Sequence, residues 1–256
     1  MSAPTTHVDR VYESLRGDIL AGHFAPGERL KFAELQTAYQ ASAGTAREAL
    51  TKLAEQGLVV AKPQSGYSVW PLSLPDLQDL TALRKDIEGL ALGYAMARAD
   101  LAWHAQLLGA HHVLEQTPQF ENDPDTGAEQ LRDEWAAAHK EFHRTLLAGC
   151  GNRRLLDFST SLRTSIDLYL RWACPVGSEQ ARDVAGEHRE ILDAVLARDE
   201  ERALAALSCH IQGTADLLLS GFSGDGVYLP PPGAGLPSAR RELAGRAGAS
   251  SRAVRT

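Results

Sequence analysis

Apolar residues at helical spacing near the amino terminus predict three helices, which are followed by a β-hairpin. The first helix, over residues 8–21, is indicated by apolar residues three or four positions apart: Val8, Val11, Leu15 and Ile19. Glycine and proline in "GHFAPGERL" end this first helix. Two more helices are predicted for "FAELQTAYQ" and "GTAREALTKLAEQG", and Ser42 is the predicted N-cap of the second of these. Two β-rich runs joined by "KPQSG" predict a hairpin over residues 58–72. This order of elements is that of a winged helix-turn-helix domain.

From residue 73 onward the pattern is helical, with short breaks rich in glycine, proline and asparagine. Helices are predicted near residues 76–98, 100–117, 127–149, 153–172, 179–198 and 200–220. No strand pattern of any strength follows residue 72. The predicted fold class is therefore mainly α: an N-terminal winged helix-turn-helix with a short β-hairpin, then an all-α helical bundle.

These patterns divide the chain into three parts. Residues 1–72 are the predicted winged helix-turn-helix domain, and residues 73–220 are the predicted helical domain. Residues 221–256 are rich in Gly, Pro, Ala and Ser, a composition that predicts a disordered tail.

Charge, cysteines and hydropathy narrow the function classes. The chain has a net charge of −7, but residues 1–72 hold as many basic as acidic residues. This balance is compatible with DNA binding, although the segment lacks the excess of basic residues that is typical of DNA-binding domains. An apolar run of membrane-spanning length is absent, and the amino terminus lacks a signal-peptide pattern. Three distant cysteines without a CxxC pair favour a reduced, cytoplasmic setting.

The third predicted helix is the candidate DNA reader, because the second helix of a helix-turn-helix pair enters the major groove with its amino end first. Arg47 lies one turn into it, where a guanidinium can reach a guanine edge or a phosphate. The candidate contacts are Ser42, Thr45, Arg47 and Lys52 on the helix and Lys62, Gln64 and Gly66 at the hairpin tip. Such a unit can also bind protein, and Arg47 could instead pair with a nearby carboxylate.

Histidines form the second candidate site. His139 and His143 in "HKEFH" are four residues apart, so both imidazoles project from one side of a helix and can reach one ion. Two more histidines, His188 and His210, follow on later predicted helices. A pair at this spacing is a weak indicator of metal by itself, since each histidine taken alone is more often an ordinary surface or hydrogen-bonded side chain.

Three stretches carry a family resemblance: "LRGDILAGHFAPGERL", "REALTKLAEQGLV" and "GYSV". Over residues 8–70 they resemble the GntR family of bacterial transcription regulators. The helical domain that follows looks like the FadR-type branch with an FCD ligand-binding domain, most similar to regulators of γ-aminobutyrate and glutarate catabolism. Family members usually carry Ser-Arg at the start of the recognition helix, where this chain has Ser42-Ala43. The family's operator sequence therefore does not transfer to this chain.

The resemblance also implies a metal site. The family motif is Asp-x-x-Phe-His plus two later histidines; Phe142 and His143 match it, His139 replaces the aspartate, and His188 and His210 match the later positions. An all-histidine set suits a divalent metal, Zn²⁺ or Ni²⁺. His139 could also point away, which would leave three histidines and water.

The same resemblance implies an effector site beside the metal. Arg84 stands at the family position of an arginine that clamps a carboxylate, and Glu88 would orient it. The alternative is an i, i+4 salt bridge between Arg84 and Glu88 on a solvated face. Arg163 lies on a helical stripe that could line the same cavity, or that could be an exposed charged face.

Together these features predict a homodimeric DNA-binding regulator, a repressor, whose affinity for double-stranded operator DNA responds to a small carboxylic acid. Glutarate and γ-aminobutyrate are candidates through the resemblance alone. One alternative is a metal-dependent enzyme with an appended winged helix, but HExxH, GxSxG and a Gly-rich phosphate loop are absent, so no catalytic role is predicted. Another alternative is a scaffold whose winged helix binds protein.

Overall fold

The computed structural model describes residues 6–122, 129–173, 182–219 and 222, which form two compact units. The first holds residues 6–74 together with Thr164–Ala173 and Phe222; the second holds Pro75–Arg163 and residues 182–219. The sequence division differs by two residues at the first boundary and does not separate the end of the 153–173 helix. Of the predicted tail, residues 223–256 lie outside the described residues.

Three helices in the first unit match the predicted ones: α1 (His7–Leu20), α2 (Phe32–Ala38) and α3 (Ala43–Glu55). A capping box at Thr6 and Asp9 begins α1. The predicted N-cap of α3 is confirmed, since the Ser42 hydroxyl accepts a hydrogen bond from the Thr45 backbone N–H. The amino end of α3 is thereby held in place by local hydrogen bonding.

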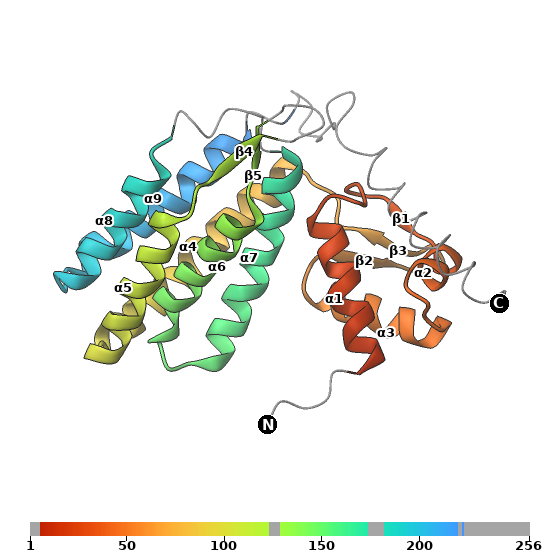
Figure 1. Cartoon of the computed structure of the whole chain (residues 1–256), viewed down its shortest axis with the longest axis horizontal. Coiled ribbons are helices and arrows are strands. Elements are labelled where there is room, and N and C mark those ends of the chain that lie inside the picture. Colours follow the sequence, from red (N-terminus) through yellow and green to blue (C-terminus); the bar gives the residue numbers. More distant parts are fainter. Residues whose placement is uncertain (1–5, 123–128, 174–181, 220–221, 223–256) are drawn as a thin grey trace. The chain divides into compact units, whose positions relative to one another are not determined.

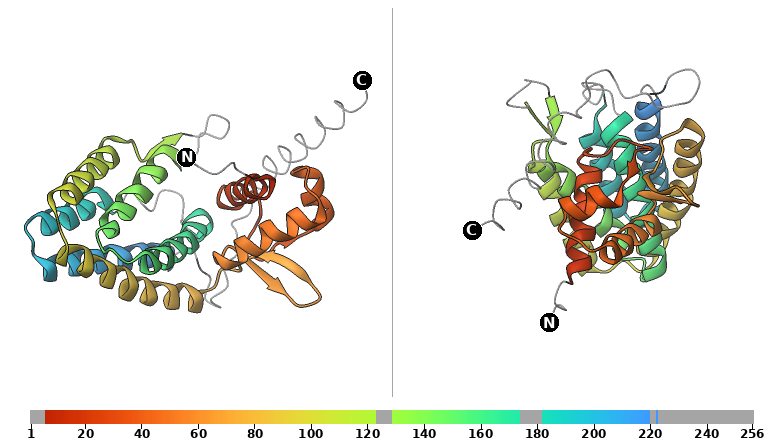
Figure 2. Two further views of the ribbon diagram at one scale, coloured as in Figure 1. Left: turned by 90° about the horizontal axis from the view of Figure 1, so that it is seen from below. Right: turned by 90° about the vertical axis from the view of Figure 1, so that its right-hand side faces the viewer.

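The hairpin is confirmed, but it belongs to a three-stranded sheet. Strands β2 (Val59–Lys62) and β3 (Gly66–Val69) pair antiparallel, and β1 (Arg29–Leu30) adds to the other edge of β3. A two-residue strand is too short to show any alternation, so β1 was not predicted. Figure 2 shows the β2–β3 hairpin extending beyond the three helices, as a wing does.

The apolar face predicted for the first helix is buried as expected. Val11, Leu15 and Ile19 of α1 are buried, and α1 packs against α3, where Val11 shares an apolar cluster with Ala46 and Ala49. The α3 residues at 1% exposure or less are Ala46, Ala49, Leu50 and Leu53. Because the apolar side of α3 is buried in the core, the opposite side of the helix is exposed. Arg47 lies on this exposed side.

The second unit is a bundle of helices (Figure 1). They are α4 (Leu74–Ala97), α5 (Leu101–Gln116), α6 (Asp133–Ala148), α8 (Val184–Leu196), α9 (Glu200–Leu219) and the first part of α7 (Arg153–Ala173), whose residues from Thr164 onward belong to the first unit. Asn152 accepts a hydrogen bond from the Leu155 N–H and so caps α7. Among the described helices, none is both long enough and apolar enough to cross a bilayer.

Two predictions for this unit are wrong in detail. A small hairpin, β4 (Phe120–Asn122) and β5 (Glu129–Leu131), occurs where no strand was expected. Because β5 occupies residues 129–131, α6 begins at Asp133 and not near residue 127. Separately, α8 begins at Val184 and not near residue 179. Strands of three residues carry too little alternation to be recognised in the sequence.

A large apolar core holds these helices together. Its fully buried members include Leu92 of α4, Leu107 of α5, Phe142 and Leu146 of α6, and Ile191 of α8. Since Phe142 and Leu146 flank His143 on α6, the packing of the core fixes the helix that carries the first two candidate ligands.

Candidate metal centre and DNA interface

Helices α6, α8 and α9 bring the four predicted histidines together in the second unit. His139 and His143 come from α6, His188 from α8 and His210 from α9, and one nitrogen from each lies within 4.8 Å of the others. His143, His188 and His210 are 0%, 2% and 3% exposed. His139 points into the group, so the alternative in which it turns away is not the arrangement observed.

The spacing of the ring nitrogens fits a metal ion. His143 Nε2 is 3.2 Å from His139 Nε2 and 3.3 Å from His188 Nε2. Four nitrogens at about 2.0–2.1 Å from a tetrahedral ion lie roughly 3.3 Å apart, so these contacts match the edge of such a polyhedron. The observed donor set is all imidazole, which suits Zn²⁺ or Ni²⁺.

Burial keeps all four imidazoles neutral. The pKa values of His139, His143 and His188 lie well below the usual value, first because of burial and then because of neighbouring positive charge. The pKa of His210 is also lowered by burial, although its hydrogen bond to Glu187 acts in the opposite direction. Neutral imidazoles keep a lone pair free for a metal, which is the state that ligation requires.

The three predicted effector residues form a buried ion-pair cluster. Arg84 Nε donates to Glu88 Oε1 at 2.7 Å, and Arg163 NH1 donates to Glu88 Oε2 at 3.1 Å. Burial would raise the pKa of Glu88, but the charges of Arg84 and Arg163 outweigh it and lower the pKa. The salt bridge of the alternative interpretation therefore exists, but it does not lie on a solvated face: the Arg84 and Glu88 side chains are 3% and 0% exposed.

This cluster lies close enough to influence the histidines. The charges of Arg163 and Arg84 both contribute to the low pKa of His139. Two guanidinium groups share one carboxylate, so the cluster carries a net positive charge beside the histidines. Such surroundings favour an anion over a cation as the small molecule bound there.

Two further residues at the site were not recognised in the sequence. Arg182 precedes α8 and Glu187 lies in its first turn; both contact the histidine on α9. Glu187 directly precedes His188, but no spacing rule connects it to His210, which is 23 residues away. The single available signal was a carboxylate adjacent to a candidate ligand.

The candidate DNA contacts lie on the exposed side of the first unit. Ser42, Arg47 and Gln64 are exposed, and the Arg47 guanidinium lies 5.4 Å from the centre of the Phe32 ring. Arg47 is thus positioned by an aromatic ring.

Other candidate contacts divide into two groups. Lys62 pairs with Gly66 at the end of the hairpin, and Gln64 between them has a φ of 61°, so all three lie at the tip as predicted. Lys52, however, donates to Asp9 Oδ1 at 2.8 Å, and this ion pair lowers the pKa of Asp9 to about 2. Lys52 is therefore engaged within the domain.

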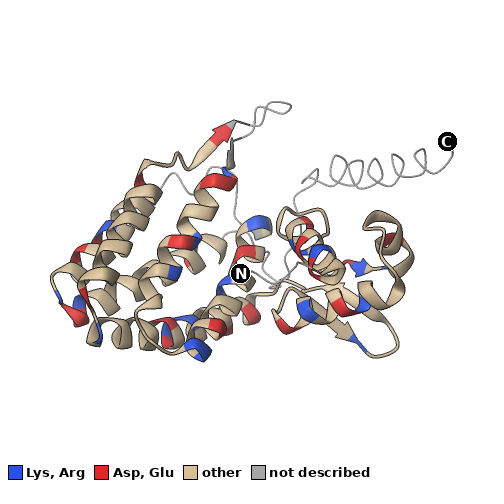
Figure 3. Cartoon of the chain, turned by 60° about the horizontal axis from the view of Figure 1, so that its bottom comes forward, with Lys and Arg blue, Asp and Glu red and all other residues tan. Residues whose placement is uncertain are grey.

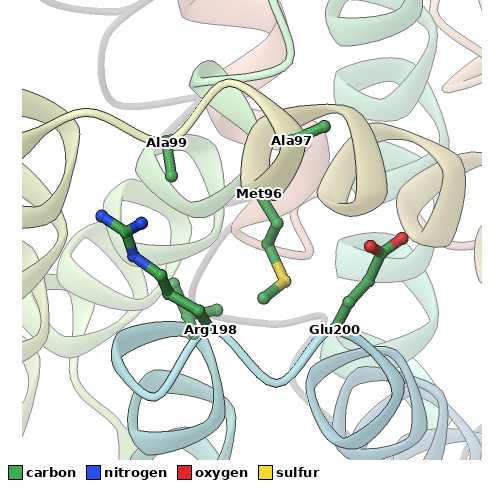
Figure 4. Close-up of a pocket in the computed structure, with 6 residues that line it drawn as sticks. Met96, Ala97, Ala99, Arg198 and Glu200 are labelled. Carbon is green, nitrogen blue, oxygen red and sulfur yellow. The ribbon is translucent and has the colours of Figure 1, made fainter.

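Neither the distribution of charged residues nor the cavity described below points to a further feature of the metal centre or the DNA interface. Figure 3 shows basic and acidic residues interspersed over the helices of both units. A cavity of about 170 Å³ at the α8–α9 turn is separate from the histidines. Figure 4 shows Met96 between Arg198 and Glu200 there. The residues that line it are Met96, Ala97, Ala99, Val195, Arg198 and Glu200.

Comparison with known proteins agrees with both parts of the fold. The family described as "Bacterial regulatory proteins, gntR family" matches residues 7–69, and the FCD domain family matches residues 79–213. The chain belongs to the GntR family. Its second unit is an FCD domain, which makes it a transcriptional regulator of the GntR/FCD type.

Relatives and solved structures extend this assignment. The chain is 32% identical over 212 residues to the HTH-type transcriptional regulator BphR of Paraburkholderia xenovorans, covering 82% of this chain and 84% of the relative. It is 30% identical over 220 residues to the HTH-type transcriptional repressor GlaR of Escherichia coli, covering 84% and 96%. The structure of E. coli McbR/YncC is similar in fold, with a TM-score of 0.69 at 17% identity over 86% and 100% of the two chains.

The metal-free protein is expected to lose stability as the pH falls from about 7.5 to 5.5. Folded-state pKa values of the four histidines are lowered, whereas unfolded histidines titrate near 6.5, so the unfolded chain binds more protons in this range. The stability is present above about pH 7 and is lost as the pH falls, by up to about 1.4 kcal/mol per pH unit for each histidine.

Urea unfolding of chelator-treated protein at several pH values measures this effect. His188→Gln should reduce the pH dependence, and His112→Gln, which changes an exposed residue of α5, should leave it unchanged. A pH-independent unfolding midpoint in the wild type would contradict the assignment of four buried neutral imidazoles.

Proposed function

We propose that this GntR-family protein represses transcription by binding operator DNA as a homodimer, and that a small carboxylic acid bound in the FCD domain controls its DNA affinity. The observation that carries the proposal is the convergence of four histidines beside a positively charged cluster, in a chain that also has a winged helix. Homodimers are expected because one winged helix contacts too little DNA, and the spacing of two half-sites supplies specificity.

In this proposal the four histidines hold Zn²⁺ or Ni²⁺. A divalent ion in a neutral ligand set would supply the positive charge that attracts a carboxylate. Arg84 and Arg163, which both donate to Glu88, would bring their guanidinium groups to the acid. Planar guanidinium groups can bind a carboxylate through paired hydrogen bonds. Glu88 orients both guanidiniums and keeps them from repelling each other.

Control of DNA binding requires that the acid prefer one arrangement of the dimer over another. The preference for one arrangement, and not the tightness of acid binding, determines how far the DNA affinity changes. A relative named as a repressor supports repression as the sense of regulation. Glutarate and γ-aminobutyrate are the first acids to test.

A metal-dependent enzyme is the main alternative, and one observation disfavours it. Glu141, the carboxylate nearest in sequence to both α6 histidines, is exposed and accepts two hydrogen bonds from the Arg144 guanidinium, at 2.7 and 2.5 Å. It lies on a different face of the helix from His139 and His143. Binding of an acid without turnover supports the regulator, whereas conversion of the acid would favour the enzyme.

DNA binding is tested by fluorescence anisotropy with duplex DNA from the region upstream of the protein's own gene, in the presence of random duplex and at two salt concentrations. Arg47→Ala is expected to cost about 1–3 kcal/mol, roughly 5- to 150-fold in affinity, because it removes a guanidinium from the exposed amino end of α3. The control Arg154→Ala changes an exposed arginine of α7 and should have little effect. Equal affinity for upstream and random duplex would exclude sequence-specific DNA recognition and favour a protein-binding winged helix.

The response to acid provides a separate test. Millimolar glutarate or γ-aminobutyrate is expected to change wild-type operator affinity by about 5- to 150-fold, the usual range of coupling between two sites. Treatment with a chelator, or His143→Ala, should abolish the response while DNA binding persists. His112→Ala is the matched control, because its imidazole is exposed on α5. A response that survives both metal removal and His143→Ala would contradict the metal-linked site.

A further inference from the structure

Beside the histidines, the side chains of Arg182, Glu187 and His210 form a continuous hydrogen-bonded chain. Glu187 Oε2 lies 2.8 Å from His210 Nδ1. Arg182 donates two N–H groups to the same carboxylate, Nε to Oε1 at 2.7 Å and NH2 to Oε2 at 2.5 Å. These hydrogen bonds thus connect the segment before α8, the first turn of α8 and the middle of α9.

The contact with Glu187 determines which nitrogen of His210 can act as a ligand. A carboxylate accepts hydrogen bonds, so Nδ1 carries the proton and Nε2 keeps its lone pair. His143 differs, because its Nδ1 is buried without a hydrogen-bond partner among the described residues. Within the set of four, His210 is therefore the imidazole whose tautomer and ring orientation are held by a carboxylate.

We propose that Glu187 is a positioning residue for the metal centre: it holds His210 in the ligating tautomer and places a negative charge against a neutral ligand set. The inference rests on the proposed metal site and deepens it. A carboxylate on the far nitrogen of a metal-bound histidine raises the basicity of the imidazole and fixes its orientation. Here that carboxylate, itself paired with Arg182, is in hydrogen-bond contact with one of the four imidazoles.

Arg182 holds Glu187 in this position. Besides its two bonds to Glu187, it donates NH1 to Thr214 Oγ1 at 3.0 Å and NH2 to the His210 carbonyl at 2.7 Å. The guanidinium also lies close against α9 at Gly213, where an added Cβ would be 2.9 Å from Arg182 Nε. With several hydrogen-bond partners, Arg182 restricts Glu187 to a single orientation, directed at His210.

An ordinary ion pair on α8 makes a matched comparison. Glu190, one turn after Glu187, accepts two N–H groups from Arg202 at 2.6 and 2.8 Å, in the same paired geometry. Both of these side chains are exposed, and they pair with each other. Glu190→Ala therefore removes a carboxylate that is paired with an arginine in the same way as Glu187. It leaves the residues of the proposed metal centre unchanged.

The test is Zn²⁺ affinity, measured by competition with a chromophoric chelator on full-length protein, with circular dichroism and thermal unfolding of the metal-free forms as controls. Glu187→Ala is expected to weaken Zn²⁺ binding by about 10- to 100-fold, the usual effect of removing such a partner. Glu187→Gln should weaken it less, because its amide oxygen can still accept the Nδ1 proton although the charge is gone. Glu190→Ala should bind as the wild type does.

The absorption spectrum of the Co²⁺-loaded protein is a second readout, since the visible bands of Co²⁺ report on its ligand geometry. The spectrum should change in Glu187→Ala and not in Glu190→Ala. If Glu187→Ala does not fold, the isosteric Glu187→Gln carries the test, and wild-type affinity in that variant together with an unchanged Co²⁺ spectrum would overturn the inference.

The outcomes separate this inference from the proposed function. Equal Zn²⁺ affinities and equal Co²⁺ spectra for the wild type, Glu187→Ala and Glu190→Ala would overturn the positioning role and leave the metal site intact. A wild type that binds neither ion would overturn the metal site and the positioning role together. Weaker binding and a changed spectrum confined to the Glu187 variants would support both.

Discussion

The helical domain is organised around four neutral imidazoles that converge in a buried space. Bringing Nε2 atoms to 3.2–3.3 Å from one another places lone pairs face to face unless a proton or a metal lies between them. The charged imidazolium form is disfavoured because burial lowers all four pKa values. A neutral ring with its proton on Nε2 can donate to one neighbour, whereas the proposed metal ion would engage all the converging lone pairs. Helices α6, α8 and α9 would then be joined by coordination as well as by apolar packing.

Charge near this centre is arranged so that each buried ion has a partner. Glu88 neutralises part of the charge of Arg84 and Arg163, and Glu187 is paired with Arg182. Burying an unpaired charge costs several kcal/mol, so such pairs are a condition for having arginines inside the domain at all. The residual positive charge next to neutral histidines would favour an anion there, which is the basis of the proposed carboxylic acid effector.

The sequence predicted those parts of the molecule that follow from local spacing. His139 and His143 were recognised because i, i+4 residues share a helical face, and Ser42 was recognised because a hydroxyl before a helix caps it. The family resemblance then linked His188 and His210 to that pair. The short strands β1, β4 and β5 were missed because two or three residues carry no detectable alternation.

Tertiary packing determined the features that local spacing could not predict. A solvated Arg84–Glu88 pair and a buried one have the same spacing, and only the position of Arg163 on α7 shows that this pair is internal. Similarly, nothing in the sequence pairs Glu187 with His210, because the contact depends on how α8 packs against α9. The orientation of His139 likewise depends on its stacking with Trp135, at 4.8 Å between ring centres.

The most direct measurement of the central claim is the X-ray absorption spectrum of the full-length protein loaded with one equivalent of Zn²⁺. The account predicts a shell of nitrogen or oxygen atoms at about 2.0–2.1 Å, with outer-shell scattering from four imidazoles and no sulfur at about 2.3 Å. A spectrum with sulfur in the first shell, or with scattering from fewer than three imidazoles, would contradict the histidine centre. Failure of the protein to retain the ion would contradict it as well.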